Sequence, residues 1–218
     1  MSLLNDAKQI AKRDPAARNI ASVIFLYSGF HALVYHRISH FFYQHKLYFL
    51  ARWNSQIARH RTGVEIHPGA TIGEGLFIDH GMGIVIGQTA VIGNNCTIYH
   101  GVTLGGRGHA KGEKRHPTIG DNVLIGAGAK ILGPVTIGND VSIGANAVIL
   151  HDVPDGATVV GVPGKVVRID GKVAGESHAV ALDHSIVDDP TELEVKELAK
   201  VVNDLQERLS KITKTNND

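Results

Sequence analysis

An aliphatic residue recurs every six positions through the middle of this 218-residue chain. The recurrence forms three runs, which are Ile66, Ile72, Ile78; then Ile86, Ile92, Ile98, Leu104; then Ile119, Ile125, Ile131, Ile137, Ile143, Ile149. A short fixed period is typical of a solenoid, in which every repeat adds one short strand and one corner. The pattern therefore predicts a parallel β-helix over residues 62–171.

The predicted coil is triangular, with three hexads and about 18 residues per turn. The aliphatic side chain points inward and stacks on its equivalent in the next coil, about 4.8 Å away. Glycine often follows the aliphatic residue, as at Gly73, Gly87 and Gly126, and suits corners where a Cβ would clash.

The repeat is interrupted twice. The spacing from Ile78 to Ile86 is eight residues, which indicates two inserted residues around Gly81-Met82-Gly83. The spacing from Leu104 to Ile119 is 15, which predicts a protruding loop over 105–117. Functional groups of a regular scaffold concentrate in such interruptions, and both contain histidines.

Aromatic residues and glycines are segregated along the chain. Ten of the 12 aromatic residues precede residue 62, whereas 23 of the 25 glycines lie between residues 63 and 171. Apolar residues at three- and four-residue spacing predict a helical domain over 1–61, with Asp14 as an N-cap followed by Pro15. A third segment, 172–218, contains a predicted coiled-coil helix at 191–213.

Charge and cysteine content exclude several functions. The net charge is +1, which gives no electrostatic reason to expect nucleic acid or an anionic membrane surface as a partner. Cys96 is the only cysteine, so an intrachain disulfide is impossible. We find neither a secretory signal nor a membrane span and expect a cytoplasmic protein.

Five short strings identify a family. They are Asp14-Pro15-Ala16, Glu65-Ile66-His67-Pro68, Ile78-Asp79-His80-Gly81, Gly101-Val102-Thr103-Leu104-Gly105-Gly106 and Lys114-Arg115-His116-Pro117. Together they resemble the serine O-acetyltransferases, a family of hexapeptide-repeat acyltransferases, from about residue 6 to residue 169. The resemblance implies a left-handed β-helix. It also implies acetyl transfer from acetyl-CoA to the hydroxyl of L-serine, the first step of cysteine biosynthesis from serine.

The resemblance implies roles for several polar residues of these strings. His80 matches the general base, a task that suits a neutral imidazole. Glu65 stands where the family has an aspartate that orients this base. Asp14 and Asp79 are expected to receive the serine ammonium, and Arg115 and His116 its carboxylate, with His116 also counted as catalytic.

The resemblance also implies binding partners. Coenzyme A is expected in a groove between neighbouring β-helices of a homotrimer, where Gly105, Gly106, Ala127 and Lys165 are the candidate contacts. L-cysteine is expected to inhibit by competing with serine, and no metal is expected. Many relatives bind O-acetylserine sulfhydrylase through a C-terminal isoleucine; this chain ends Asn216-Asn217-Asp218, so we expect weak or absent binding of that kind.

Three alternatives remain open from the residues. A zinc-dependent hydratase on the same β-helix would need three converging histidines, and His100, His109 and His116 are the clustered candidates. A sugar or antibiotic acetyltransferase is chemically closer, but does not explain the helical Asp-Pro-Ala. A non-catalytic scaffold explains the repeat alone. A metal assay, and acetyl-CoA turnover with serine, a sugar or no acceptor, would separate them.

Overall fold

The computed structural model describes residues 3–108, 112–173 and 202. The chain separates into two compact units, Met1–Ala179 and Val180–Asp218, and almost all described residues belong to the first. Four helices come first: α1 (Leu3–Arg13), α2 (Ile20–Leu26), α3 (Ser28–Gln44) and α4 (Tyr48–Thr62). The change from helix to strand falls at Gly63 and Val64, because Gly63 ends α4 in the left-handed conformation.

Short strands follow, and each belongs to one of three sheets. Sheet A contains β1 (Glu65–Ile66), β4 (Val85–Ile86), β7 (Thr103–Gly105), β10 (Lys130–Leu132) and β13 (Val148–Ile149). Sheet B contains β2 (Thr71–Ile72), β5 (Val91–Ile92), β8 (Thr118–Ile119) and β11 (Thr136–Ile137). Sheet C contains β3 (Phe77–Ile78), β6 (Thr97–Ile98), β9 (Leu124–Ile125), β12 (Ser142–Ile143), β14 (Ala157–Val160), β15 (Lys165–Ile169) and β16 (Lys172–Val173).

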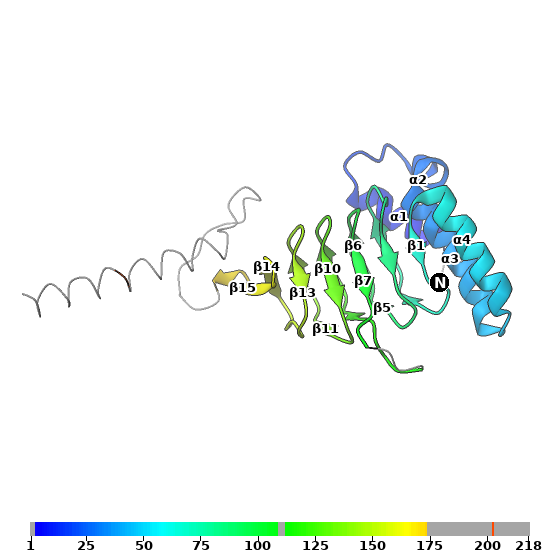
Figure 1. Cartoon of the computed structure of the whole chain (residues 1–218). Coiled ribbons are helices and arrows are strands. Elements are labelled where there is room, and N and C mark those ends of the chain that lie inside the picture. Colours follow the sequence, from blue (N-terminus) through cyan, green and yellow to red (C-terminus); the bar gives the residue numbers. More distant parts are fainter. Residues whose placement is uncertain (1–2, 109–111, 174–201, 203–218) are drawn as a thin grey trace, which may run out of the picture. The chain divides into compact units, whose positions relative to one another are not determined.

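The chain visits the sheets in the order A, B, C and then returns to A. The strands therefore form the three sides of a coil, and we name the turns between sides the A–B, B–C and C–A corners. Equivalent strands of successive coils pair in parallel, with Ile66 opposite Ile86 and Ile86 opposite Leu104. The described part is an N-terminal helical block followed by a left-handed parallel β-helix, so the predicted fold class is confirmed (Figure 1).

The predicted inward positions form the core of the β-helix. Each of the thirteen aliphatic residues of the repeat is at most 5% exposed. The small residues of the corners, among them Ala70, Cys96 and Ala129, join the same buried cluster. Burial of an uninterrupted column of branched side chains stabilises every coil against its neighbours.

The helices pack against the first coil, near β1 and β3 (Figure 1). The Arg37 guanidinium donates to the carbonyl oxygens of Ile72 and Gly73 at 2.7 and 2.8 Å. Gly29 of α3 lies so close to β3 that an added Cβ would be 2.2 Å from the Ile78 carbonyl oxygen. A side chain is excluded there, and this close approach brings the helices beside the end of β3.

The prediction that Asp14 begins a helix is wrong. Asp14 follows the end of α1 and forms a turn, and the next helix begins at Ile20 with Asn19 as its N-cap. Asn19 accepts from the Ser22 amide, and the Ser22 side chain returns to the Asn19 backbone in a capping box. The capping prediction failed because the Asp14 carboxylate accepts from the Ala16 amide and forms an Asx turn instead of a helix N-cap.

Both interruptions of the repeat lie where the spacing predicts them. The first separates β3 from β4 at a C–A corner, and the second separates β7 from β8 at an A–B corner, where the loop extends from the β-helix (Figure 1). The predicted helix at 191–213 lies outside the described residues, apart from Val202. No described helix is both long enough and apolar enough to cross a membrane.

Candidate active site

The turn after β3 exposes an imidazole. His80 has a φ of 60°, and Gly81 and Gly83 both have a φ of 77°, so three left-handed residues redirect the chain within this short insertion. The His80 side chain is 72% exposed, and its Nε2 lies 3.8 Å from Asp79 Oδ1. The turn thus presents a base and a neighbouring carboxylate to the surface.

A cavity of about 630 Å³ lies beside this turn. His80 and Met82 line one part of it, and Ser28 together with the end of α4 lines the rest, namely Gln56, Arg59, His60, Arg61, Thr62 and Gly63. Two arginines and two histidines surround this space, so it suits a ligand with polar or anionic groups.

Asp14 lies in the same region, held by two hydrogen bonds. Its Oδ1 accepts from the Ala16 amide at 2.8 Å, and its Oδ2 accepts from the Tyr27 hydroxyl at 2.5 Å. The bond to Asp14, together with burial and the charges of Asp14 and Asp79, raises the pKa of Tyr27 to about 12. Tyr27 thus contacts Asp14 directly, and the charge of Asp79 acts on the same hydroxyl.

Glu65 has other partners than the predicted one. Its carboxylate pairs with Arg52 at 3.0 Å and with Arg59 at 3.4 Å, both on α4. The carboxylate next to His80 is that of Asp79, and none of the described contacts joins Glu65 to His80. The Glu65–His80 pair therefore stays a prediction.

Arg115 and His116 lie at an A–B corner, where His116 is only 6% exposed. Its Nδ1 accepts from the Thr89 amide at 3.2 Å and contacts the Thr89 hydroxyl at 2.8 Å. Burial, then the charges of Arg115 and Lys114, lower the pKa of His116. A neutral imidazole with an accepting Nδ1 carries its proton on Nε2.

Glycines make room for this imidazole. A Cβ on Gly87 would lie 1.9 Å from His116 Cδ2, and one on Gly106 would lie 3.0 Å from His116 Nε2. The same added Cβ on Gly106 would lie 3.3 Å from the Arg115 side chain. Gly106, which is expected to contact coenzyme A, thus lies beside Arg115 and His116, which are expected to bind the serine carboxylate.

The predicted site residues fall into two groups within one chain. Asp79 and His80 lie at the C–A corner of the first coil, and Asp14 is bonded to Tyr27 of the α2–α3 junction, which contacts that corner through Ser28. Arg115 and His116 lie at an A–B corner. One side of the coil separates the two corners, and about six residues of extended chain span roughly 20 Å. No described contact links the groups, so a single chain does not assemble them.

The predicted coenzyme residues are divided in the same way. Gly105 and Gly106 end β7 at the A–B corner, whereas Ala127 follows β9 at a C–A corner. Gly83, Gly101 and Gly128 stack at successive C–A corners, where a Cβ on Gly101 would lie 3.4 Å from Gly128 Cα. Lys165 begins β15 opposite Val160, beyond the last of these corners.

Two residues of the site were missed by sequence analysis, and a third, His100, was considered there only as a zinc ligand. Tyr27 and Thr89 are the hydrogen-bond partners of Asp14 and His116. The His100 ring packs edge-on against that of His80, with centroids 5.8 Å apart. A signal for His100 was present, because it follows Ile98 by two residues just as His80 follows Ile78.

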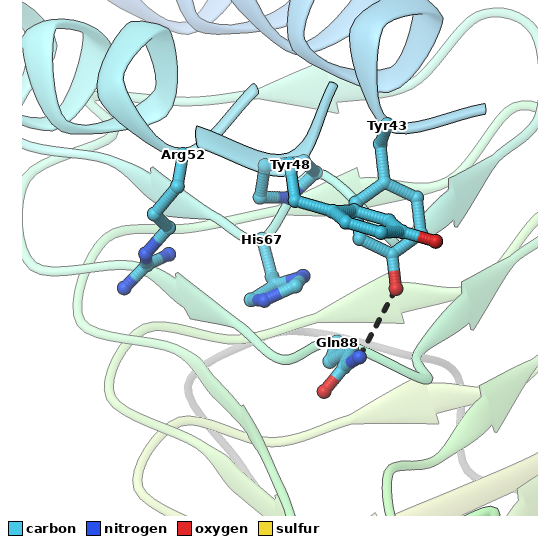
Figure 2. Close-up of a pocket in the computed structure, with 6 residues that line it drawn as sticks. Tyr43, Tyr48, Arg52, His67 and Gln88 are labelled. Carbon is cyan, nitrogen blue, oxygen red and sulfur yellow. Dashed lines mark hydrogen bonds between the residues drawn. The ribbon is translucent and has the colours of Figure 1, made fainter. Parts of the chain in front are cut away.

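A second, smaller cavity of about 270 Å³ lies between the α3–α4 hairpin and the A–B corner. Figure 2 shows Tyr43, Tyr48 and Arg52 above His67 and Gln88, with a hydrogen bond of 3.1 Å between Tyr43 and Gln88. Burial, followed by the charges of Arg52 and His116, lowers the pKa of His67 to about 4. His67 is therefore a neutral, structural residue near pH 7.

The three histidines proposed for zinc are not gathered by the fold. His100 lies at a C–A corner and His116 at an A–B corner, while His109 lies outside the described residues. Among residues 3–108 and 112–173, no group of three or more His, Cys, Asp or Glu side chains could hold a metal ion.

Comparison with known proteins identifies the family. Residues 116–151 match the bacterial transferase hexapeptide family (six repeats), and residues 81–107 match the hexapeptide repeat of succinyl-transferase. The serine acetyltransferase of Bacillus pumilus is 51% identical over 212 residues, which cover 97% of this chain and 95% of that protein. The serine acetyltransferase of Staphylococcus xylosus is 54% identical over 196 residues, covering 90% and 88% of the two chains.

Solved structures agree with these relatives. The serine acetyltransferase of Neisseria gonorrhoeae matches with a TM-score of 0.75 and 47% identity, over 77% of this chain and 65% of that one. This chain thus spans slightly less than two thirds of the gonococcal protein. Related structures include the soybean enzyme complexed with serine and a serine acetyltransferase in complex with cysteine. The repeat, the strings at its interruptions and these similarities together show that the chain belongs to the serine acetyltransferase family.

Proposed function

We propose that this chain is a serine O-acetyltransferase, which transfers the acetyl group of acetyl-CoA to the hydroxyl of L-serine and releases O-acetyl-L-serine and CoA. The observation that carries this proposal is the exposed His80 beside Asp79, at the edge of the larger cavity, in a chain of this family. The reaction is the first step of cysteine biosynthesis from serine. Serine bound to the soybean relative supports the choice of acceptor.

His80 is the general base. It removes the hydroxyl proton as the serine oxygen attacks the thioester carbon, so a carbon–oxygen bond forms and the carbon–sulfur bond then breaks. The proton passes from His80 to the departing thiolate, which leaves as the CoA thiol. Asp79 stabilises the transient imidazolium because its carboxylate is 3.8 Å away. Glu65, which stands where the family has an aspartate, is the second carboxylate that we propose orients the imidazole.

Serine is a zwitterion, and the two groups of site residues carry opposite charges. Asp14 and Asp79 receive the ammonium, and Arg115 receives the carboxylate through its planar guanidinium. His116 adds a second donor, because Thr89 occupies its Nδ1 and leaves the Nε2 proton available.

The separation of these groups supports a homotrimer in which each site lies between two subunits. The C–A corner of one copy, with His80 and Ala127, would face the A–B corner of another, with Gly105, Gly106 and Arg115. Acetyl-CoA would lie in the groove between them, and its phosphates would reach Lys165. The helical part, 1–61, supplies Asp14 to this site, and the β-helix, 62–171, supplies the other groups; the extension 172–218 is a third segment.

The same site explains inhibition by L-cysteine, which has the ammonium and carboxylate of serine. A related structure contains bound cysteine, which supports this assignment. Inhibition should be competitive with serine.

The decisive experiment measures acetyl-CoA consumption with L-serine, with a sugar and without acceptor, and identifies O-acetylserine among the products. Loss of a positioned base costs about 10²–10⁴ in rate, so His80→Ala should lower kcat by that factor. Glu65→Gln should lower it less, because the imidazole remains. Near-normal kcat in His80→Ala together with an inactive His116→Ala would place the base on the second interruption and contradict our assignment.

A further inference from the structure

The junction between α2 and α3 touches the candidate site at three consecutive residues. The Tyr27 hydroxyl donates to Asp14 Oδ2, and the Ser28 hydroxyl donates to the His80 carbonyl oxygen at 3.3 Å. Gly29 packs its backbone directly against Ile78, the last residue of β3. The backbone of Tyr27 is therefore held in a defined position relative to the turn that contains His80.

The hydrogen bond from Tyr27 to Asp14 joins a hydroxyl to a charged carboxylate and is therefore a strong one. At 2.5 Å it falls in the range of hydroxyl–carboxylate bonds, which are roughly twice as strong as those between neutral groups. Asp14 itself lies in a turn between two helices, where the only other described donor to its carboxylate is the Ala16 amide. Without Tyr27, one oxygen of Asp14 would have no partner among the described residues.

The Tyr27 hydroxyl stays in its donating form. The pKa of Tyr27 is raised to about 12 by its bond to Asp14, by burial and by the charges of Asp14 and Asp79. The hydroxyl is therefore protonated throughout the neutral range. The Tyr27 ring also packs against a small cluster of buried residues, namely Ala7, Ile10, Val23, Phe30 and Phe77, which anchors it.

We propose that Tyr27 is a positioning residue that orients the Asp14 carboxylate toward the amino group of the acceptor substrate. This inference rests on the proposed function, since it requires that Asp14 receives the ammonium. Two donors, one on each oxygen, fix the plane of the carboxylate before substrate binds. A carboxylate free to rotate would have to be immobilised on binding, and that cost would appear as weaker binding of the acceptor.

Tyr27→Phe tests the inference, because it keeps the packed ring and removes only the hydroxyl. The KM for serine should rise roughly 2- to 10-fold, which is the cost of immobilising one side chain. Values of kcat and of the KM for acetyl-CoA should stay within about twofold, because the ammonium is bound equally in the ground and transition states. Tyr43→Phe is the matched control, since the Tyr43 hydroxyl accepts from Gln88 in the smaller cavity.

Two further measurements separate a positioning role from a merely structural one. In an Asp14→Ala background, Tyr27→Phe should change the KM for serine by less than about twofold, because coupled residues are not additive. In alkaline absorbance titrations, the ionisation assigned to Tyr27 by difference from Tyr27→Phe should move to lower pH in Asp14→Ala. This titration needs no substrate and tests the bond itself.

The outcomes are distinguishable. An active wild-type enzyme whose KM for serine is unchanged by Tyr27→Phe overturns this inference and leaves the proposed function standing. A full additional effect of Tyr27→Phe in Asp14→Ala, or an unmoved titration, also overturns it. Wild-type protein that does not acetylate serine contradicts the proposed function, and the inference about the ammonium fails with it.

Discussion

At the scale of single residues, the two candidate histidines are in different physical environments. His80 is exposed on a left-handed turn beside Asp79. His116 is buried, and Thr89 accepts from the amides of Arg115 and His116 at 3.1 Å while contacting the His116 ring. An exposed imidazole can exchange protons with a substrate, whereas a buried one held by its neighbours is suited to fixed hydrogen bonding.

Arg115→Ala should raise the KM for serine about 10- to 100-fold, because hydrogen bonds to a charged group contribute about 1.5–3 kcal/mol. The kcat should change far less, since the carboxylate is bound in both the ground and transition states. Steady-state kinetics with varied serine measures both constants. Arg107→Ala on the same loop is the control, because the first carbon atoms of the Arg107 side chain lie close to Gly133. A large fall in kcat with unchanged KM would contradict a binding role for Arg115.

At the scale of elements, the contact between α3 and the first coil contains a buried histidine. His36 is 3% exposed, and neither ring nitrogen has a hydrogen-bond partner among the described residues. Ser55 and Ala58 of α4 and Val64 and Ile66 of the first coil surround it. Burial, then the charges of His40, Arg37 and His67, lowers the pKa of His36 to about 3.

Acid should therefore weaken the attachment of the helices. Between pH 6.5 and about 3, the unfolded chain binds a proton at His36 that the folded chain excludes, so stability falls as the pH is lowered. Protonation of His36 in the unfolded chain should lower the free energy of unfolding by about 2 kcal/mol between pH 7.5 and pH 5.0. Urea unfolding at both pH values, at one protein concentration, should show a smaller loss in His36→Leu than in the wild type.

The control for this experiment is His151→Leu, at an exposed position after β13. It should leave the pH-dependent loss of stability as it is in the wild type. An equal loss in His36→Leu and the wild type would show that His36 does not govern the acid sensitivity.

At the scale of the whole molecule, we expect the proposed site to form between two chains. A His80→Ala chain keeps an intact A–B corner, and an Arg115→Glu chain keeps an intact C–A corner. In mixed trimers of the two inactive variants, one of the three sites should combine both intact corners, because each subunit of a threefold ring faces the next. Co-expression with two different affinity tags, followed by purification through both, selects the mixed trimers and should therefore restore about a third of wild-type activity at limiting serine.

Each variant expressed alone is the control and should stay inactive under the same conditions. Light scattering should give the mass of a trimer for the wild type and for the mixture. Mixed trimers without restored activity would show that each site lies within one chain.

Much of the fold follows from the sequence alone. A period of six determines which residues point inward, because every third hexad returns to the same side of the coil, and Ile66, Ile86 and Leu104 are indeed paired. The interruptions showed where to look for His80, Arg115 and His116. Counting hexads from Ile66 also places His80 after the third side and His116 after the first, so even their separation was encoded in the repeat.

The partners of these residues were decided by tertiary structure. Glu65 binds Arg52 and Arg59 because α4 packs along β1, and Asp14 is held by Tyr27 because the α2–α3 junction packs against β3. A solenoid repeats the same geometry in every coil, so counting residues from one repeat predicts the side and the orientation of the next. The helices have no such period, and their side-chain contacts depend on how two dissimilar surfaces fit together, so that only the folded chain shows which carboxylate meets which donor.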